Sequence, residues 1–298
     1  MKDILGKNQK IADIEALRGI GLLLVVSYPF FERFLQLFIP GHEPSHFLGM
    51  DQWGLAGVAI FLLISGYFLV PAYSIDSMSY LKKRIVRLFP LYFMSICIIF
   101  LVTHIWPFPR TVTFTQFMLN IPLLNGFIGM PYVDEVHWYL TALVSGILVF
   151  SCIIQLPGKY RHVAYWGWLA ILLGLHYLNP SLNYFHLLKN GLYGLIGGNS
   201  APVLIIGASL ADIHGQSRDI LGYITLLPVA LGTKFVLETF PLAQLMVISG
   251  AVVLLVVSLH HLCIIFRMKW LIGLGTISYL VYLIHQNIWF RNTTFLYR

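Results

Sequence analysis

"EALRGIGLLLVVSYPFFERF", residues 15–34, is the stretch that decides how this chain folds. It opens with charged residues and two glycines and continues as an apolar run. Pro29 and the charged pair Glu32 and Arg33 then stand where a membrane helix would keep hydrocarbon side chains. At about 100° per residue, Arg18 and position 29 share a helix face, and Glu32 lies close to that face. The stretch therefore predicts a membrane helix with one face that is polar at both ends.

The composition extends this interpretation to the whole chain. Of its 298 residues, 58% are hydrophobic and 10% are charged, and the mean hydropathy of +0.79 is far from that of a soluble domain. Runs of the roughly 20 helical residues that cross a hydrocarbon core recur throughout. We expect an all-α, polytopic transmembrane bundle that forms a single membrane-embedded domain, 1–298. Its nine expected spans are 14–39, 52–72, 88–106, 137–156, 162–179, 194–212, 219–236, 243–263 and 270–290.

The positive charge lies mostly on one side of the expected bundle. With the N-terminus in the cytoplasm, thirteen Lys and Arg residues fall on the cytoplasmic side and six on the other. This asymmetry is typical of membrane topology, so the net charge of +7 gives no reason to expect a nucleic-acid partner. The cysteines all lie inside expected spans, which leaves no disulfide framework and no cysteine-based metal site: Cys97, Cys152 and Cys263.

The longest loop, 105–136, contains "TFTQFMLNIPLLNGFIGM". This segment is apolar, but it is short for a span and is interrupted by proline and glycine. We therefore predict an interfacial or re-entrant element within this loop.

Ionisable groups near the predicted spans are candidates for function, because charge is costly in hydrocarbon. Arg18, Arg84 and Arg87 lie on the cytoplasmic side, together with Lys82 and Lys83. Guanidinium groups suit phosphate, because their forked donors match its oxygen atoms. Anchoring at the membrane surface is the alternative, and we favour it for the two lysines.

A second group of ionisable residues lies in the external half. It contains imidazoles, whose pKa near neutrality suits acid–base work on a hydroxyl group. The alternative for the histidines is an aromatic belt at the membrane interface. The group consists of Glu32, Arg33, His104, His137 and His285.

Five segments carry a family resemblance: "IEALRGIGLLLVV", "GVAIFLLISGYFL", "YLKKRIVRLFPLYF", "LLNGFIGMPYVDEVHWYLTAL" and "GTISYLVYLIHQNI". In this order they resemble the motifs of the integral-membrane acyltransferase family three. That family includes O-antigen, Nod-factor and peptidoglycan O-acetyltransferases. The resemblance covers both ends and the middle of the chain, so it is specific to the family and not to a substrate.

The resemblance implies transfer of an acyl group, usually acetyl, from cytoplasmic acyl-CoA (acetyl-CoA) to a sugar hydroxyl. The acceptor would be a glycan or a lipid-linked sugar at the bacterial inner membrane, and no metal is expected. His285 matches the histidine of the family's late-helix signature. The matching arginines, which the resemblance assigns to the donor or to a pore, are Arg18, Arg84 and Arg87.

The sequence departs from the family at two points. The family's proposed catalytic histidine stands at the position of Pro29, and the family usually has ten spans. Glu32 could act as the base if burial raises its pKa, or it could form a structural ion pair. His46 and Asp51 have the His-x4-Asp spacing of glycerolipid acyltransferases, although a solvated loop fits them better.

We therefore expect a membrane O-acyltransferase that modifies an envelope or exopolysaccharide sugar. The alternative is a non-catalytic relative that binds or conducts a glycan or lipid intermediate, because the histidine at position 29 is lost. The residues assigned to the reaction are Arg18, Glu32, His137 and His285 as catalytic groups, and Arg84 and Arg87 as donor-binding groups.

Overall fold

The computed structural model describes residues 2–28, 50–70, 76–105, 112–123, 131–177, 191–215, 220–237, 241–260 and 264–296. Every regular element in these ranges is a helix, which confirms the all-α prediction. The chain divides into two compact units. Unit 1 combines Met1–Ile64 with Leu242–Arg298, and unit 2 comprises Ser65–Pro241. The single domain expected over 1–298 stays a prediction.

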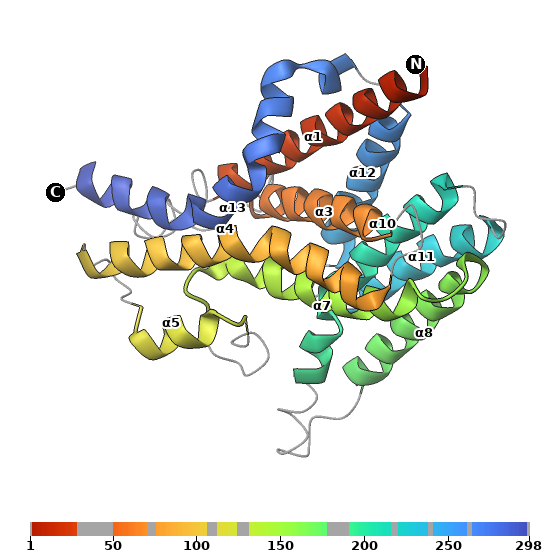
Figure 1. The fold of residues 1–298 in the computed structure, drawn as a ribbon, viewed down its shortest axis with the longest axis horizontal. Helices are drawn as coiled ribbons and strands as arrows, with labels where there is room; N and C mark the ends of the chain where they lie inside the picture. Colours follow the sequence, from red (N-terminus) through yellow and green to blue (C-terminus); the bar gives the residue numbers. More distant parts are fainter. Residues whose placement is uncertain are drawn as a thin grey trace. The chain divides into compact units, whose positions relative to one another are not determined.

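Unit 1 is built around its first and last helices. The helix α1 (Lys2–Tyr28) packs most extensively against α13 (Lys269–Leu296), as Figure 1 shows. The unit is completed by the first part of α3 (Met50–Leu69), by α12 (Pro241–Leu259) and by the short 3-10 helix η4 (Ile264–Arg267). The helix α1 begins well ahead of position 14, where the sequence places the start of the first span.

Glycine lets the backbones of unit 1 touch. A Cβ atom added at Gly19 would overlap a backbone carbonyl oxygen of α13, and one at Gly275 would overlap the carbonyl oxygen of Glu15. Between α1 and α3, a Cβ atom at Gly57 would overlap the carbonyl oxygen of Gly21. The glycines of the opening stretch are therefore packing residues, a role that the sequence analysis did not assign to them.

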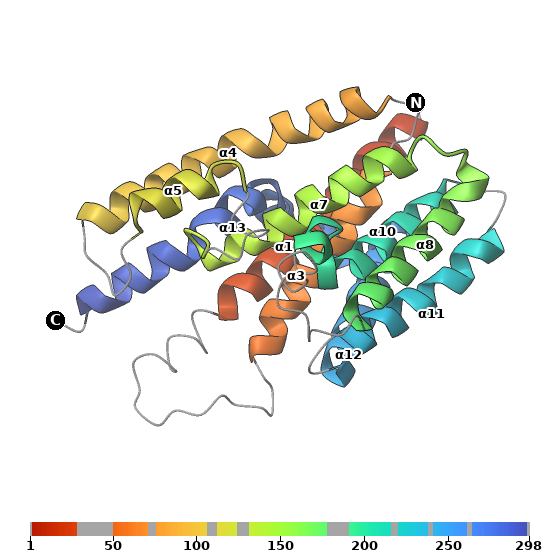
Figure 2. The ribbon, with the colours of Figure 1, turned by 90° about the horizontal axis from the view of Figure 1, so that it is seen from below.

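Unit 2 has α10 (Ala201–His214) at its centre, preceded by the short 3-10 helix η3 (Gly198–Ser200). Every residue of α10 from Ala201 to Ser209 is buried. The helix α11 (Ile220–Leu237) packs against both α10 and α8 (Gly158–Tyr177), as Figure 2 shows. The last residues of α3 belong to this unit, where a Cβ atom at Gly66 would overlap the carbonyl oxygen of Leu204.

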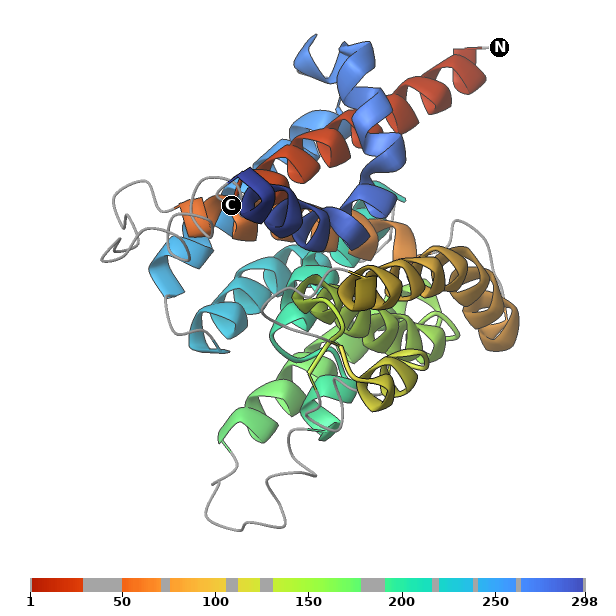
Figure 3. The ribbon, with the colours of Figure 1, turned by 90° about the vertical axis from the view of Figure 1, so that its left-hand side faces the viewer.

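The helices α4 and α7 lie side by side in unit 2. The long α4 (Ser77–Ile105) contacts α7 (Trp138–Ile153), and the 3-10 helix η2 (Glu135–His137) leads into α7 (Figure 2). The short α5 (Phe114–Asn120) lies beside α4 (Figure 3), with the rings of Phe100 and Phe117 stacked 4.5 Å apart. It occupies the loop where the sequence predicts an interfacial or re-entrant element.

Each of the nine predicted spans overlaps a helix. Three segments of the described chain are long and apolar enough to cross a membrane: Ser77–Ile105, Glu135–Ile153 and Gly191–His214. Shorter apolar helices cover Trp53–Leu69, Leu221–Leu237 and Gln244–Leu259. The chain is thus a helical membrane bundle, and its orientation stays a prediction.

Candidate functional site

Arg18 forms an ion pair within α1. Its Nη1 atom donates to Oε1 of Glu15 at 2.6 Å, and the two side chains are 22% and 20% exposed. Residues three positions apart share a helix face, which makes the pair possible. The second carboxylate oxygen of Glu15 is buried and has no hydrogen-bond partner among the described residues. Glu15 is not among the residues predicted from the sequence, although the spacing in "EALR" signals the pair.

His285 is oriented by its own helix, α13. Its Nδ1 atom lies 2.8 Å from the carbonyl oxygen of Tyr282. Because a carbonyl oxygen only accepts, Nδ1 is the donor in this contact. Ser278 and Tyr282 are buried, and the ring of Tyr282 meets that of Phe61 edge to face at 5.8 Å. Unit 1 therefore contains Arg18 and an imidazole whose Nδ1 atom is bound to its own helix.

His137 is enclosed at the start of α7. Its side chain is 0% exposed, and its ring meets the ring of Tyr92 edge to face, with the centroids 5.2 Å apart. The buried side chain of Asp134 accepts a hydrogen bond from the backbone N–H of Val136 at 3.2 Å. The carbonyl oxygen of Asp134 accepts from the backbone N–H of His137 at 3.0 Å. The turn η2 thus holds the backbone of His137 in place.

Two buried amide side chains of α5 hold the segment that leads to His137. Asn120 accepts a hydrogen bond from the backbone N–H of Val133 at 3.1 Å, and it donates to the carbonyl oxygen of Gln116 at 2.8 Å. The side chain of Gln116 donates to the carbonyl oxygen of Tyr132 at 2.9 Å. The sequence analysis assigned no role to either amide, because a buried amide has no distinctive sequence pattern.

The basic segment at the start of α4 contains both bound and exposed cations. Arg84 donates through Nη2 to the carbonyl oxygen of Phe68, and its guanidinium lies 5.4 Å from the ring centre of Tyr80. Arg87 and Lys82 are exposed. The two arginines that the sequence assigns to the donor therefore differ: one is held against the end of α3, and the other is open to the surroundings.

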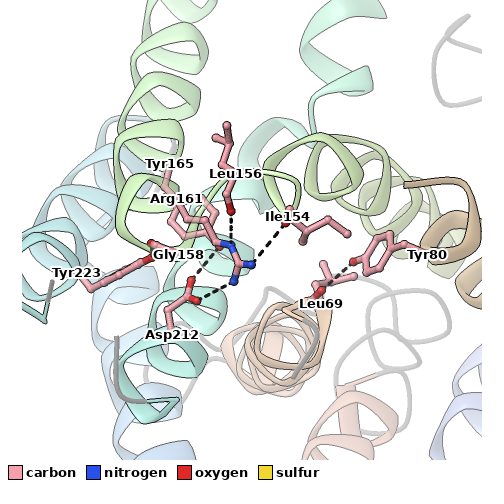
Figure 4. A network of polar contacts seen from close by, with 9 residues as sticks. All are labelled: Leu69, Tyr80, Ile154, Leu156, Gly158, Arg161, Tyr165, Asp212 and Tyr223. Atoms are coloured by element: carbon pink, nitrogen blue, oxygen red, sulfur yellow. Dashed lines mark hydrogen bonds and ion pairs between the residues drawn. The ribbon is translucent and has the colours of Figure 1, made fainter. Parts of the chain in front are cut away.

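A second ion pair lies in unit 2, between α8 and α10 (Figure 4). Arg161 donates through Nη1 to Asp212 at 3.2 Å, and its guanidinium also donates to the carbonyl oxygens of Ile154 and Leu156. The hydroxyl of Tyr165 donates to the other carboxylate oxygen of Asp212 at 3.2 Å. In the sequence Arg161 contributes only to the predicted cytoplasmic charge. The pair has no local sequence signal, because 51 positions separate the two residues.

The remaining predicted residues lie elsewhere. His104 is exposed near the end of α4, where its Nδ1 atom lies 2.9 Å from the carbonyl oxygen of Phe100. Pro29, Glu32 and His46 lie outside the described residues. Among the residues assigned to the reaction, unit 1 contains Arg18 and His285, and unit 2 contains His137, Arg84 and Arg87.

The comparison with protein families gives one match. A family model described as an acyltransferase domain matches residues 11–296 of the chain. Neither a curated protein nor a solved structure matches this chain. The matched range begins before Arg18 and ends after His285, so it includes every residue of the candidate site.

Proposed function

Because the chain belongs to acyltransferase family 3, we propose that it acts as a membrane O-acyltransferase. The acyl group, acetyl in this proposal, moves from cytoplasmic acyl-CoA to a hydroxyl group of an envelope or exopolysaccharide sugar. The acceptor is a glycan or a lipid-linked sugar, and the protein resides in the inner membrane of a bacterium. The family match over residues 11–296 is the observation that carries this proposal.

In this proposal Arg84 and Arg87 bind the phosphate groups of the donor. They stand three positions apart on α4, so they are neighbours on the helix surface. A guanidinium offers five N–H donors, more than the bond from Nη2 of Arg84 to the carbonyl oxygen of Phe68 requires. That bond also fixes the side chain in advance, which lowers the entropy cost of binding the donor.

The reaction needs a base for the acceptor hydroxyl, and we assign this role to Nε2 of His285. The hydroxyl oxygen attacks the thioester carbonyl carbon, forming the new C–O bond while the C–S bond breaks. The hydroxyl proton passes to Nε2, and CoA leaves as a thiolate that takes up a proton. Arg18, paired with Glu15, is assigned to the pore through which the donor thioester reaches this base. Glu32 and His137 are the other groups assigned to proton transfer.

One observation favours a second function. Position 29, where the family's proposed catalytic histidine stands, is a proline in this chain. A relative without that base would bind or conduct a glycan or lipid intermediate without turnover. The two functions differ in whether acyl-CoA is consumed.

The test supplies the purified protein in lipid nanodiscs with acetyl-CoA, and water takes the place of the sugar hydroxyl as acceptor of the acyl group. We expect the wild type to release free CoA thiol faster than empty nanodiscs do. Replacing a catalytic base typically costs about 10²–10⁴-fold in rate, so His285→Ala should lose activity on that scale. The matched control is His104→Ala, because His104 also bonds a carbonyl of its own helix but is exposed. Equal activity of the two variants would remove His285 from the mechanism.

Two further variants separate the proposed functions. Full activity in Glu32→Gln would exclude Glu32 as the base. Glycan or lipid binding by the wild type without thiol release, together with new activity in Pro29→His, would establish the non-catalytic alternative. The predicted cytoplasmic N-terminus is tested by labelling single cysteines in the segments 38–50 and 73–83 of intact cells. Labelling of the second segment from outside would invert the topology.

A further inference from the structure

The buried face of α5 is polar. Gln116 is 7% exposed and Asn120 is 0% exposed, and Phe117 beside them is 9% exposed. A helix of seven residues is too short to be stable by itself, so its tertiary contacts decide where it lies. Buried amides need hydrogen-bond partners, and the partners of these two lie in the segment 131–133 that precedes His137.

Asn120 connects this segment to both α5 and α4. Its Oδ1 atom accepts from the backbone N–H of Val133 at 3.1 Å, and its Nδ2 atom donates to the carbonyl oxygen of Pro131 at 3.3 Å. Its backbone carbonyl oxygen accepts a hydrogen bond from the hydroxyl of Tyr92. One fully buried residue therefore binds two neighbouring elements at once.

Gln116 supports the same segment from the previous turn of α5. Its Nε2 atom donates to the carbonyl oxygen of Tyr132 at 2.9 Å. The hydroxyl of Tyr132 donates in turn to Oγ1 of Thr141 on α7 at 3.2 Å. Burial raises the pKa of the Tyr132 hydroxyl, and the hydrogen bond to Thr141 opposes this shift without reversing it. Because the pKa is raised, the hydroxyl keeps its proton at neutral pH and remains a donor. The chain entering η2 is thus bound on two sides.

Tyr92 links these hydrogen bonds to His137. Its hydroxyl bonds the carbonyl of Asn120, and its ring is the one that meets His137 edge to face at 5.2 Å. The backbone carbonyl at position 120 thus fixes the aromatic ring against which His137 packs, and the Asn120 side chain fixes the segment that leads to His137.

We propose that Asn120 is a positioning residue that holds His137 in place, with Gln116 as its support. This inference rests on the proposed function, in which His137 is one of the groups assigned to proton transfer. An asparagine is required because one short side chain must accept from the backbone N–H of Val133 and donate to the carbonyl oxygen of Pro131. Aspartate would lack the donor, and leucine would lack both groups.

The first test measures how fast diethyl pyrocarbonate modifies His137, resolved by peptide mass spectrometry on the full chain in nanodiscs. We expect His137 to react slowly in the wild type and about tenfold faster in Asn120→Ala, because loss of buried hydrogen bonds favours local opening. The exposed His104 and His176 are internal references that should not change. An unchanged rate at His137 would overturn the proposal.

The matched control is Asn199→Ala. Asn199 is a half-buried amide of the same unit that donates to the carbonyl oxygen of Leu237, far along the chain from His137. It should leave the rate at His137 unaltered, and an equal acceleration would also overturn the proposal. Should Asn120→Ala fail to fold, Gln116→Ala is the milder variant and should give a smaller acceleration.

The second readout is catalytic. If Asn120 positions His137, Asn120→Ala lowers kcat and leaves KM for acetyl-CoA unchanged, and Asn199→Ala keeps its activity. If the loss came from general destabilisation, Asn199→Ala would lose as much active protein as Asn120→Ala. A wild type without acyl transfer would remove the proposed function, but the modification rates would still decide whether Asn120 holds His137. The two failures are therefore distinguishable.

Discussion

In unit 1, α1 and α13 touch backbone to backbone at Gly19 and Gly275, whereas in unit 2 the helix ends are joined by long polar side chains such as Arg161 and Tyr80. Between membrane helices the hydrophobic effect gives little attraction, so close packing and interhelical hydrogen bonds drive association. Unit 1 depends on close backbone contact at these glycines, whereas unit 2 combines one such contact, at Gly66, with side-chain hydrogen bonds. The two kinds of contact should fail in different ways: a backbone contact when a methyl group is added, and a hydrogen bond when its donor or acceptor is removed.

The polar side chains of unit 2 end on carbonyl oxygens at the ends of helices. Arg84 and Tyr80 donate to carbonyls at the end of α3, and Arg161 donates to two carbonyls beyond the end of α7. The last carbonyls of a helix have no partner within it, and positive charge near them is favourable. Basic residues that appear in the sequence as surface charge therefore also serve as helix caps.

The largest effect is expected from Gly275→Ala. The added methyl group would overlap the backbone of Glu15, which cannot rotate away as a side chain could. Overpacking of this kind costs about 3 kcal/mol, so the thermal unfolding midpoint in detergent should fall strongly. Gly273→Ala is the matched control, because a Cβ atom there would meet nothing within 4 Å. Equal midpoints for the two variants would contradict the backbone contact.

Removal of one partner of the Arg161 pair should have the next largest effect. In Asp212→Ala the guanidinium loses its carboxylate in a mostly buried position, with side-chain exposures of 18% for Arg161 and 7% for Asp212. We expect a loss of about 2–3 kcal/mol in unfolding free energy, less than for a fully buried pair because Arg161 reaches solvent. A double-mutant cycle with Arg161→Ala measures the coupling, and additive losses would argue against it.

The same contrast explains what the sequence could predict. The apolar runs predict the helices, because about 20 consecutive apolar residues leave few alternatives in a membrane. The spacing of Glu15 and Arg18 is sufficient to predict their ion pair. The contacts of Asn120 and Asp212 were not predictable, because each joins segments whose approach only the fold determines. The glycines of unit 1 were visible in the sequence, but the helix that each would touch was not.

A smaller loss is expected from Tyr80→Phe. The change removes only the hydroxyl that donates to the carbonyl oxygen of Leu69 at 2.9 Å and leaves the ring beside Arg84. A single hydrogen bond of this kind is worth about 1 kcal/mol, which should appear as a modest fall in the unfolding midpoint. Tyr160→Phe is the control, because Tyr160 is 51% exposed and should tolerate the change. If Tyr160→Phe lowered the unfolding midpoint as much as Tyr80→Phe, the loss would not be due to the missing hydrogen bond to Leu69.

The smallest effect should come from Asp76, which precedes α4 outside the span. Hydrogen bonds from Ser79 lower the pKa of this exposed carboxylate below its usual range. A group whose pKa is lowered by folding stabilises the protein above its unfolded pKa, and this contribution is lost as the pH falls through the lower folded value. The midpoint difference between the wild type and Asp76→Ala should therefore be constant from pH 7 to about pH 5, shrink as the pH falls below about 4, and vanish only below the lowered folded pKa. A difference that grows in acid would mean that Asp76 is stabilised in its protonated form, and the contact with Ser79 would then contribute nothing to the start of α4.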